Sequence, residues 1–135
     1  MSKALVGKTV TAIYLSSDKE KIKFEVGGEE PIVAFTVADC CSITWIEAVE
    51  IPALGLPAKV IEMQDLDLSL LAEDDHPEYD YLQFYGVKLV TDRGELVIDY
   101  RNSSNGYYGG NLVWPGGATS RYETPSNDST WNKVA

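Results

Sequence analysis

The chain has 135 residues, of which 44% are apolar and 24% charged, the composition of a single globular domain with one core. Eleven Lys and Arg residues stand against 21 Asp and Glu residues, and the net charge of -10 argues against direct binding to nucleic acid or to an anionic membrane. The sequence has no apolar span of about 18 residues and does not begin like a secretory signal, so we expect a cytoplasmic protein.

The first part of the chain predicts an antiparallel meander. Residues 8–15 are rich in β-branched and aromatic side chains, and residues 21–26 alternate between apolar and charged side chains as a half-buried strand requires. A third strand is expected at 32–37, where Val33, Phe35 and Val37 share one side.

Residues 39–50 predict a helix, because Cys41, Trp45, Ala48 and Val49 have the spacing of one helical face. The adjacent thiols of Cys40 and Cys41 would then lie at the helix start, where the helix dipole lowers the pKa of a thiol.

Neither cysteine has a companion for a disulfide framework or a zinc site, since the two are neighbours and His76 is the only histidine. We therefore expect two packed thiols, and no metal or cofactor. A position at a helix start permits a redox or nucleophilic role, but the sequence offers no partner base close to the two thiols.

Residues 58–71 predict a strand that runs into an acidic loop. Between Lys59 and Lys88 there is no basic residue and there are eight carboxylates. A solvated loop explains this charge, and a calcium loop fits poorly because the D-x-D-x-D-G pattern is absent. A third interpretation is an acidic surface that occupies a basic groove on a partner, with these candidate residues: Asp65, Asp67, Glu73, Asp74, Asp75 and Glu78.

The second half predicts a long hairpin at 79–102, joined at Asp92, Arg93 and Gly94. Gly86 interrupts the first run, so we expect a β-bulge near Tyr85. We place one domain at 1–114 and expect the tail at 115–135, rich in Gly, Pro and Ser, to be flexible or to wrap the surface.

The run RNSSNGYYGGNLVW at 101–114 permits two interpretations. Asn105 and Gly106 are typical of a tight turn that returns the chain to the sheet. Alternatively, Asn105, Tyr107 and Tyr108 form a contact loop, since tyrosine among Ser, Gly and Asn is the composition of adaptable recognition loops.

Three segments of the chain resemble a family of small uncharacterised proteins found mainly in tailed phages and some of their bacterial hosts. They are LVGKTVTAIYLSSDKEKIKFEV, ADCCSITWIEAVEI and LQFYGVKLVTDRGELVIDYRNSSNGYYGGNL. The resemblance covers residues 5–113 and is most specific at DCC, at the tryptophan after it and at SNGYY. It implies a phage origin and a shared fold, but no reaction.

Together these observations predict an α+β fold, with an antiparallel sheet of about five or six strands, formed by a meander and a long hairpin, and one main helix at about 40–50. We do not expect an enzyme, because the sole histidine has no G-x-S-x-G serine to activate and no phosphate-binding loop is present.

The functional expectation is an acidic accessory protein of a phage, in the host cytoplasm, that binds and modulates a host macromolecule as a nucleic-acid mimic or as an inhibitor of a host protein. The alternatives are a small-ligand binding or sequestering protein that uses the SNGYYGG loop, and a virion or assembly component. A host protein is the expected partner, and a homodimer through an edge strand is compatible with the sequence.

Overall fold

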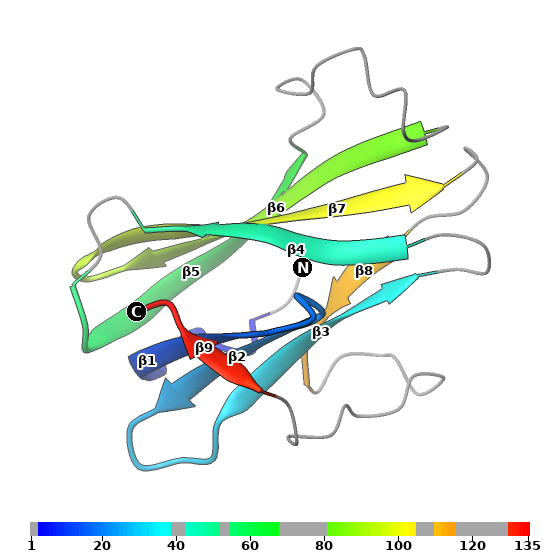
Figure 1. The fold of residues 1–135 in the computed structure, drawn as a ribbon. Coiled ribbons are helices and arrows are strands. Elements are labelled where there is room, and N and C mark those ends of the chain that lie inside the picture. The colour runs from blue at the N-terminus through cyan, green and yellow to red at the C-terminus, as the bar shows by residue number, and fades with distance from the viewer. Residues whose placement is uncertain (1–2, 39–42, 52–54, 68–80, 105–109, 116–129) are drawn as a thin grey trace.

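The protein is an all-β structure in its described part. The computed structural model describes residues 3–38, 43–51, 55–67, 81–104, 110–115 and 130–135, and these contain strands and turns but no helix (Figure 1). The strands are β1 (Thr9–Ser16), β2 (Lys21–Val26), β3 (Ile32–Ala38), β4 (Ile43–Glu50), β5 (Ala58–Asp67), β6 (Tyr81–Thr91), β7 (Gly94–Ser104), β8 (Gly110–Val113) and β9 (Trp131–Lys133). The prediction of an α+β fold with five or six strands is therefore wrong.

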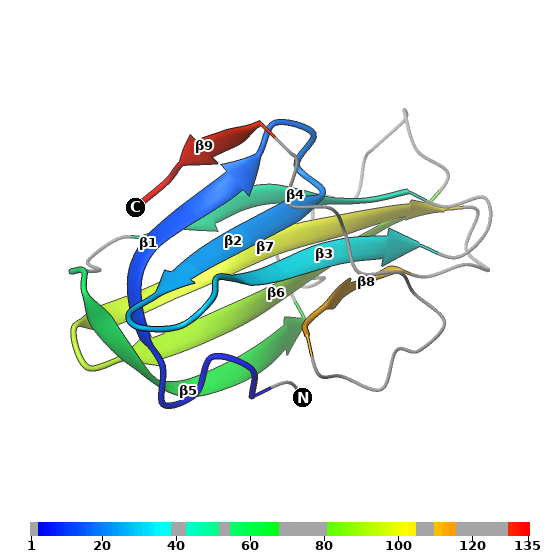
Figure 2. The same cartoon turned by 90° about the horizontal axis from the view of Figure 1, so that it is seen from below.

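All nine strands belong to one antiparallel sheet, in the order β4-β7-β6-β5-β1-β2-β3-β8, with β9 beside β1. Strands β5 and β1 share only two residue pairs, Thr9 with Lys59 and Val10 with Ala58. The sheet turns back on itself at this short junction, and its two halves face one another (Figures 1 and 2). We call β4, β7, β6 and β5 the β4 half, and β9, β1, β2, β3 and β8 the β1 half.

The hydrophobic core lies between the two halves. The core side chains come mainly from alternate positions of the strands, as the two-residue period of a strand requires. Phe24 of β2 is fully buried and stacks on Trp114, with ring centroids 5.6 Å apart. Other fully buried side chains come from both halves: Ile13, Ile22, Ile46, Val60, Leu89 and Ile98.

The predicted meander is confirmed. Strands β1, β2 and β3 pair in sequence order, and Lys19 adopts a φ of 61° in the turn between β1 and β2. Residues 21–26 alternate as predicted, with Phe24 and its even-numbered neighbours in the core. On β3 the core residue is Ala34, so Val33, Phe35 and Val37 lie half-buried on the outer face.

The predicted helix at about 40–50 is wrong, because residues 43–50 form strand β4 along β7. The register shifts between Ile46 and Ala48, so Glu47 is the extra residue of a β-bulge. Thr44 and Ile46 face the core before the bulge, and Val49 packs against the core after it. The bulge places Trp45 and Ala48 three residues apart on the outer face, with Val49 next in sequence on the inner face, and this spacing resembles that of one helical face.

The correction of this segment removes the argument for a low thiol pKa. Cys40 and Cys41 lie outside the described residues, and the segment that follows them, Ile43–Glu50, is a strand without a helix dipole. The structure therefore gives no support to activated thiols.

The predicted hairpin of β6 and β7 is confirmed, and its turn uses Gly94 at a φ of 128°. The bulge expected near Tyr85 is wrong, since Gly86 pairs with Asp99 on one side and Leu66 on the other in continuous register. The apolar residues change sides there because two aromatic neighbours point in opposite directions. Phe84 points outward beneath Arg101, whereas Tyr85 points inward opposite Tyr100.

The C-terminal residues pair with part of β1. Strand β9 pairs with the second half of β1, and the backbone N–H of Ile13 donates to the carbonyl of Ala135 at 2.9 Å. Trp131, the first residue of β9, is half-buried on the outer face of the β1 half.

Candidate functional site

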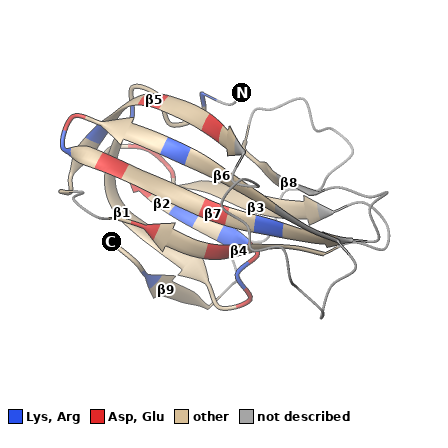
Figure 3. Cartoon of the chain, turned by 90° about the horizontal axis from the view of Figure 1, so that it is seen from above, with Lys and Arg blue, Asp and Glu red and all other residues tan. Residues whose placement is uncertain are grey.

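Charged residues occur on all four strands of the β4 half (Figure 3), and many of them point to its outer face. Pairing among β4, β7, β6 and β5 places seven charged side chains on it, which we call the acidic face: Glu47, Glu50, Glu62, Lys88, Glu95, Asp99 and Arg101. Lys59 lies on the same outer side of β5 but beyond this face, at the junction with β1. Five carboxylates and two basic groups give this face a net charge of -3. The glutamates among them are all solvent-exposed.

Both basic side chains on the acidic face already bind carboxylates of the same face. Lys88 Nζ lies 3.3 Å from a carboxylate oxygen of Glu95. The Arg101 guanidinium lies 3.4 Å from Asp99 and 3.7 Å from Glu47. A ligand at this face therefore meets negative charge, because its positive charges are neutralised from within.

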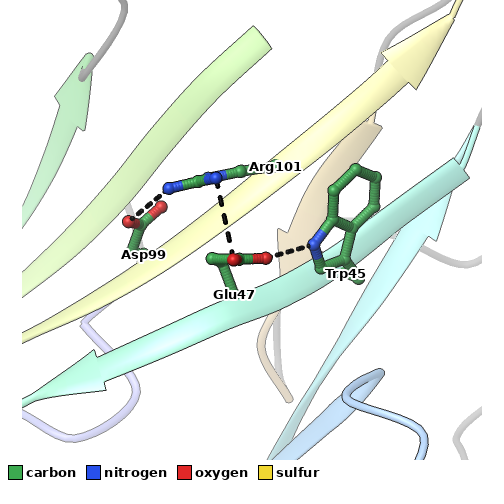
Figure 4. Close-up of polar contacts among 4 residues, drawn as sticks. All are labelled: Trp45, Glu47, Asp99 and Arg101. Carbon is green, nitrogen blue, oxygen red and sulfur yellow. Dashed lines mark hydrogen bonds and ion pairs between the residues drawn. The ribbon is translucent and has the colours of Figure 1, made fainter. Parts of the chain in front are cut away.

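Four residues form a cluster on the acidic face, along the edge strand β4 and its neighbour β7: Trp45, Glu47, Asp99 and Arg101 (Figure 4). The β-bulge turns Glu47 toward both neighbours: its carboxylate accepts a hydrogen bond from Trp45 Nε1 at 2.7 Å and pairs with Arg101. Arg101 in turn lies over the ring of Phe84, with its central carbon 4.4 Å from the ring centroid. These contacts fix the orientation of the tryptophan and of the guanidinium.

Asp99 lies in the most desolvated part of the cluster. Burial raises the pKa of its carboxyl above the ordinary 3.8, while Arg101 acts to lower it and the carboxylates of Glu50 and Glu47 act to raise it further. Its Oδ1 atom and Arg101 Nε are buried and have no hydrogen-bond partner among the residues that the structure describes. Polar groups of this kind cost stability unless a partner is supplied.

The chemistry of the cluster suits recognition. An arginine bound by two carboxylates is neither a base nor a nucleophile, and no hydroxyl, thiol or imidazole belongs to the cluster. Within the ranges that the structure describes, no three His, Cys, Asp or Glu side chains are placed to hold a metal ion.

A second polar site lies inside the sheet near the end of β7. Asn102 is fully buried, and its Nδ2 donates to Thr44 Oγ1 at 2.9 Å and to the carbonyl of Ile43 at 3.3 Å. Within the described part of the chain, its Oδ1 has no hydrogen-bond partner. Nearby on the same inward side, Tyr100 stacks on Tyr85 at 5.4 Å between centroids, and burial above all raises the pKa of Tyr100 to about 12.

The residues predicted for the acidic binding surface are mostly beyond the described part of the chain. Asp65 is exposed on β5, but it pairs with Val87 and so points to the opposite side from the acidic face. Asp67 is the last residue of β5. Four others lie outside the described residues: Glu73, Asp74, Asp75 and Glu78.

The strand residues that flank the two most specific sequence motifs, DCC and SNGYY, lie at the same end of the fold. Ala38 pairs with Gly110, and Ile43 pairs with Ser103, so the strand residues that flank 39–42 and 105–109 are neighbours. The predicted loop residues Asn105, Tyr107 and Tyr108, and the thiols of Cys40 and Cys41, lie outside the described residues.

Sequence reasoning missed the acidic face for an identifiable reason. Glu47 and Glu50 were assigned to a helix, so they were not aligned with β7. The alternation of residues 94–104 puts Asp99 and Arg101 on one side of the strand. The sequence does not show that this side pairs with β4, and so it does not bring Glu47 and Glu50 beside them.

Comparison with protein families gives one match. The model of a domain of unknown function (DUF7448) matches residues 3–114. The chain belongs to this family. The resemblance to a family of uncharacterised proteins is confirmed to that extent. No curated protein and no solved structure matches the chain. The described residues of this family member include no helix long and apolar enough to cross a membrane.

Proposed function

We propose that this member of the DUF7448 family is a non-enzymatic accessory protein of phage origin that binds a basic site on a host protein. The observation that carries the proposal is the acidic face, where both basic groups are held by carboxylates and the exposed glutamates face solvent. The net charge of -10 adds long-range attraction to a positive partner.

The acidic face has the features of a protein contact surface. Trp45 is held in place by Glu47 beside the exposed Ile43, 66% of whose surface is accessible. An oriented aromatic side chain with an apolar neighbour is typical of the centre of an interface, and the surrounding glutamates fit the Lys and Arg side chains of a basic groove. Such grooves commonly bind nucleic acid, so the protein would act there as a competitor for a polyanion.

The experiment compares three charge-neutralised variants in affinity capture from host cells. The first changes the acidic face by Glu47→Gln, Glu50→Gln and Glu62→Gln. The matched control removes the same charge from exposed positions outside that face, by Glu20→Gln, Glu29→Gln and Glu30→Gln. The third changes the acidic segment outside the described residues, by Glu73→Gln, Asp74→Asn, Asp75→Asn and Glu78→Gln.

Loss of a captured host protein in the first variant, with retention in the control, is the expected result. Duplex DNA added as a competitor should displace that partner, and the binding should weaken as salt rises. Loss in the third variant alone would assign binding to the 73–78 segment instead. Equal capture by all variants would rule out recognition by charge.

A small-ligand function is the second candidate, and the observation that favours it is Asn102. Its fully buried amide oxygen, which has no hydrogen-bond partner in the described ranges, can accept a hydrogen bond from a ligand N–H or O–H group. Native mass spectrometry of the purified protein, with thermal shifts against nucleosides and amino acids, tests this candidate. The candidate predicts a bound ligand mass or a rise in melting temperature that the Asn102→Leu variant loses. If wild type shows neither, the candidate is rejected.

A further inference from the structure

The outer faces of the two halves carry opposite charge. On the β1 half, strand pairing places Lys21, Lys23, Glu25 and Lys133 on the outer side, which we call the basic face. Three lysines and one glutamate give it a net charge of +2, against -3 for the acidic face. A positive face is notable in this chain, because the net charge of the whole chain is -10.

The basic face has an ordered aromatic centre. Lys23 Nζ lies 5.0 Å from the ring centroid of Tyr14 and 4.7 Å from that of Trp131. These cation–π contacts hold the ammonium group against two rings from β1 and β9. Lys133 is exposed beside them, and Val33 and Phe35 of β3 extend the same outer side with half-buried apolar groups.

We infer that the basic face of one copy binds the acidic face of a second copy, so that the chain associates head to tail. The two faces lie on opposite outer sides of the folded sheet (Figures 2 and 3). A symmetric dimer through either face would bring like charges together, -3 against -3 or +2 against +2, whereas a head-to-tail contact pairs unlike charges. This inference goes beyond the proposed function and does not depend on it.

Charge complementarity selects a second copy as the occupant. A nucleic acid has negative charge along its whole length, so most of it would be repelled by the rest of an acidic chain. A second copy concentrates carboxylates in one face beside Trp45, opposite a face with lysines and Trp131. Its own net charge opposes approach at long range, so the contact is weak, with a dissociation constant on the order of 0.1 mM.

The experiment uses two variants that each block one face. Glu50→Lys with Glu62→Lys reverses charge on the acidic face and leaves the cluster of Trp45, Glu47, Asp99 and Arg101 unchanged. Lys21→Glu with Lys133→Glu reverses charge on the basic face and leaves Lys23 on its aromatic rings. Sedimentation velocity at physiological ionic strength measures the mass of each protein alone and of the equimolar mixture, with duplex DNA as a separate additive.

The wild type should show an average mass that rises with concentration, each variant alone should be monomeric, and the equimolar mixture should associate again, beginning with a 1:1 dimer. The dimer forms because one intact face of each kind remains in the mixture. Lys3→Glu with Lys19→Glu is the control, since it adds the same negative charge at exposed sites that belong to neither face and should associate like wild type.

Three results of the sedimentation runs without DNA would overturn the inference. They are a monomeric wild type at about 1 mM, well above the expected dissociation constant; self-association that survives in either variant; or a mixture that stays monomeric although both variants unfold at the wild-type temperature. Binding of the DNA by the wild type and not by the Lys21→Glu, Lys133→Glu variant would assign the basic face to a polyanion and would also reject it.

Discussion

The guanidinium of Arg101 lies over the ring of Phe84, with its central carbon 4.4 Å from the ring centroid. Its two terminal nitrogens form ion pairs with the carboxylates of Asp99 and Glu47. Phe84 is nearly buried on an outer sheet face as a result. One side chain therefore covers an aromatic ring and neutralises part of a desolvated carboxylate, which makes Arg101 the residue whose loss should disturb the acidic face most.

Arg101→Ala should lower the free energy of unfolding by about 2 kcal/mol, because it uncovers Phe84 and leaves Asp99 without its cation. Arg101→Lys should cost about half as much, since the charge remains but the planar stacking is lost. Urea denaturation at pH 7 measures both. Equal stability of the alanine variant and wild type would show that the cluster contributes nothing to the fold.

Asp99→Asn should change the dependence of stability on pH. The pKa of Asp99 is raised in the folded state, so the folded protein binds the proton more readily than the unfolded chain does. The contribution of Asp99 to stability is then absent below about pH 4 and becomes unfavourable as pH rises through the folded pKa. The melting temperature of Asp99→Asn minus that of wild type should therefore increase from pH 3 to pH 7.

Asp18→Asn provides the opposite sign as a control. A hydrogen bond from Ser16 Oγ at 2.6 Å and one from the backbone N–H of Glu20 at 3.0 Å lower the pKa of Asp18 below 3.8. Its stabilising contribution is present above the unfolded pKa and is lost as pH falls through the folded one. This variant should be less stable than wild type at pH 7, with the difference shrinking toward pH 3. Parallel pH profiles for the two variants would contradict both assignments.

Ile46→Ala and Ile43→Ala test the alternation of β4. Ile46 is fully buried and Ile43 is 66% exposed, although the two are only three residues apart. The first change should cost about 3 kcal/mol and the second no more than about 0.5 kcal/mol. In a helix, residues three apart share a face, so similar losses for the two variants would favour the helical interpretation over the strand.

Deletion of Glu47 tests the β-bulge. Because Glu47 is the unpaired extra residue, its removal leaves Ile46 opposite Tyr100 and Ala48 opposite Asp99. We expect a cooperative unfolding transition within about 2 kcal/mol of wild type. Deletion of Trp45, in the regular part of the strand, would turn Thr44 outward and should abolish cooperative unfolding. Thermal melts followed by circular dichroism distinguish the two, and the reverse ranking would exclude the bulge.

The sequence predicted the strands wherever the alternation was uninterrupted. Residues 21–26 and the β6–β7 hairpin were found because their apolar positions repeat every second residue or meet at a glycine turn. Residues 43–50 were misassigned, although Ile43, Thr44, Ile46 and Val49 are β-branched, because the bulge broke the period. The acidic face depends on pairing between β4 and β7, which lie about fifty residues apart, and local patterns do not encode that contact.

The bond between Ile13 and Ala135 joins residues 122 positions apart. Among the described strands, only β9 pairs with Tyr14, Leu15 and Ser16 on that side of β1. A growing chain therefore exposes this backbone edge from its first strand until residue 135 has left the ribosome, and such an edge is a template for pairing with other chains. Closing so long a loop is also slow. Folding of this sheet is thus completed only after synthesis has passed residue 135.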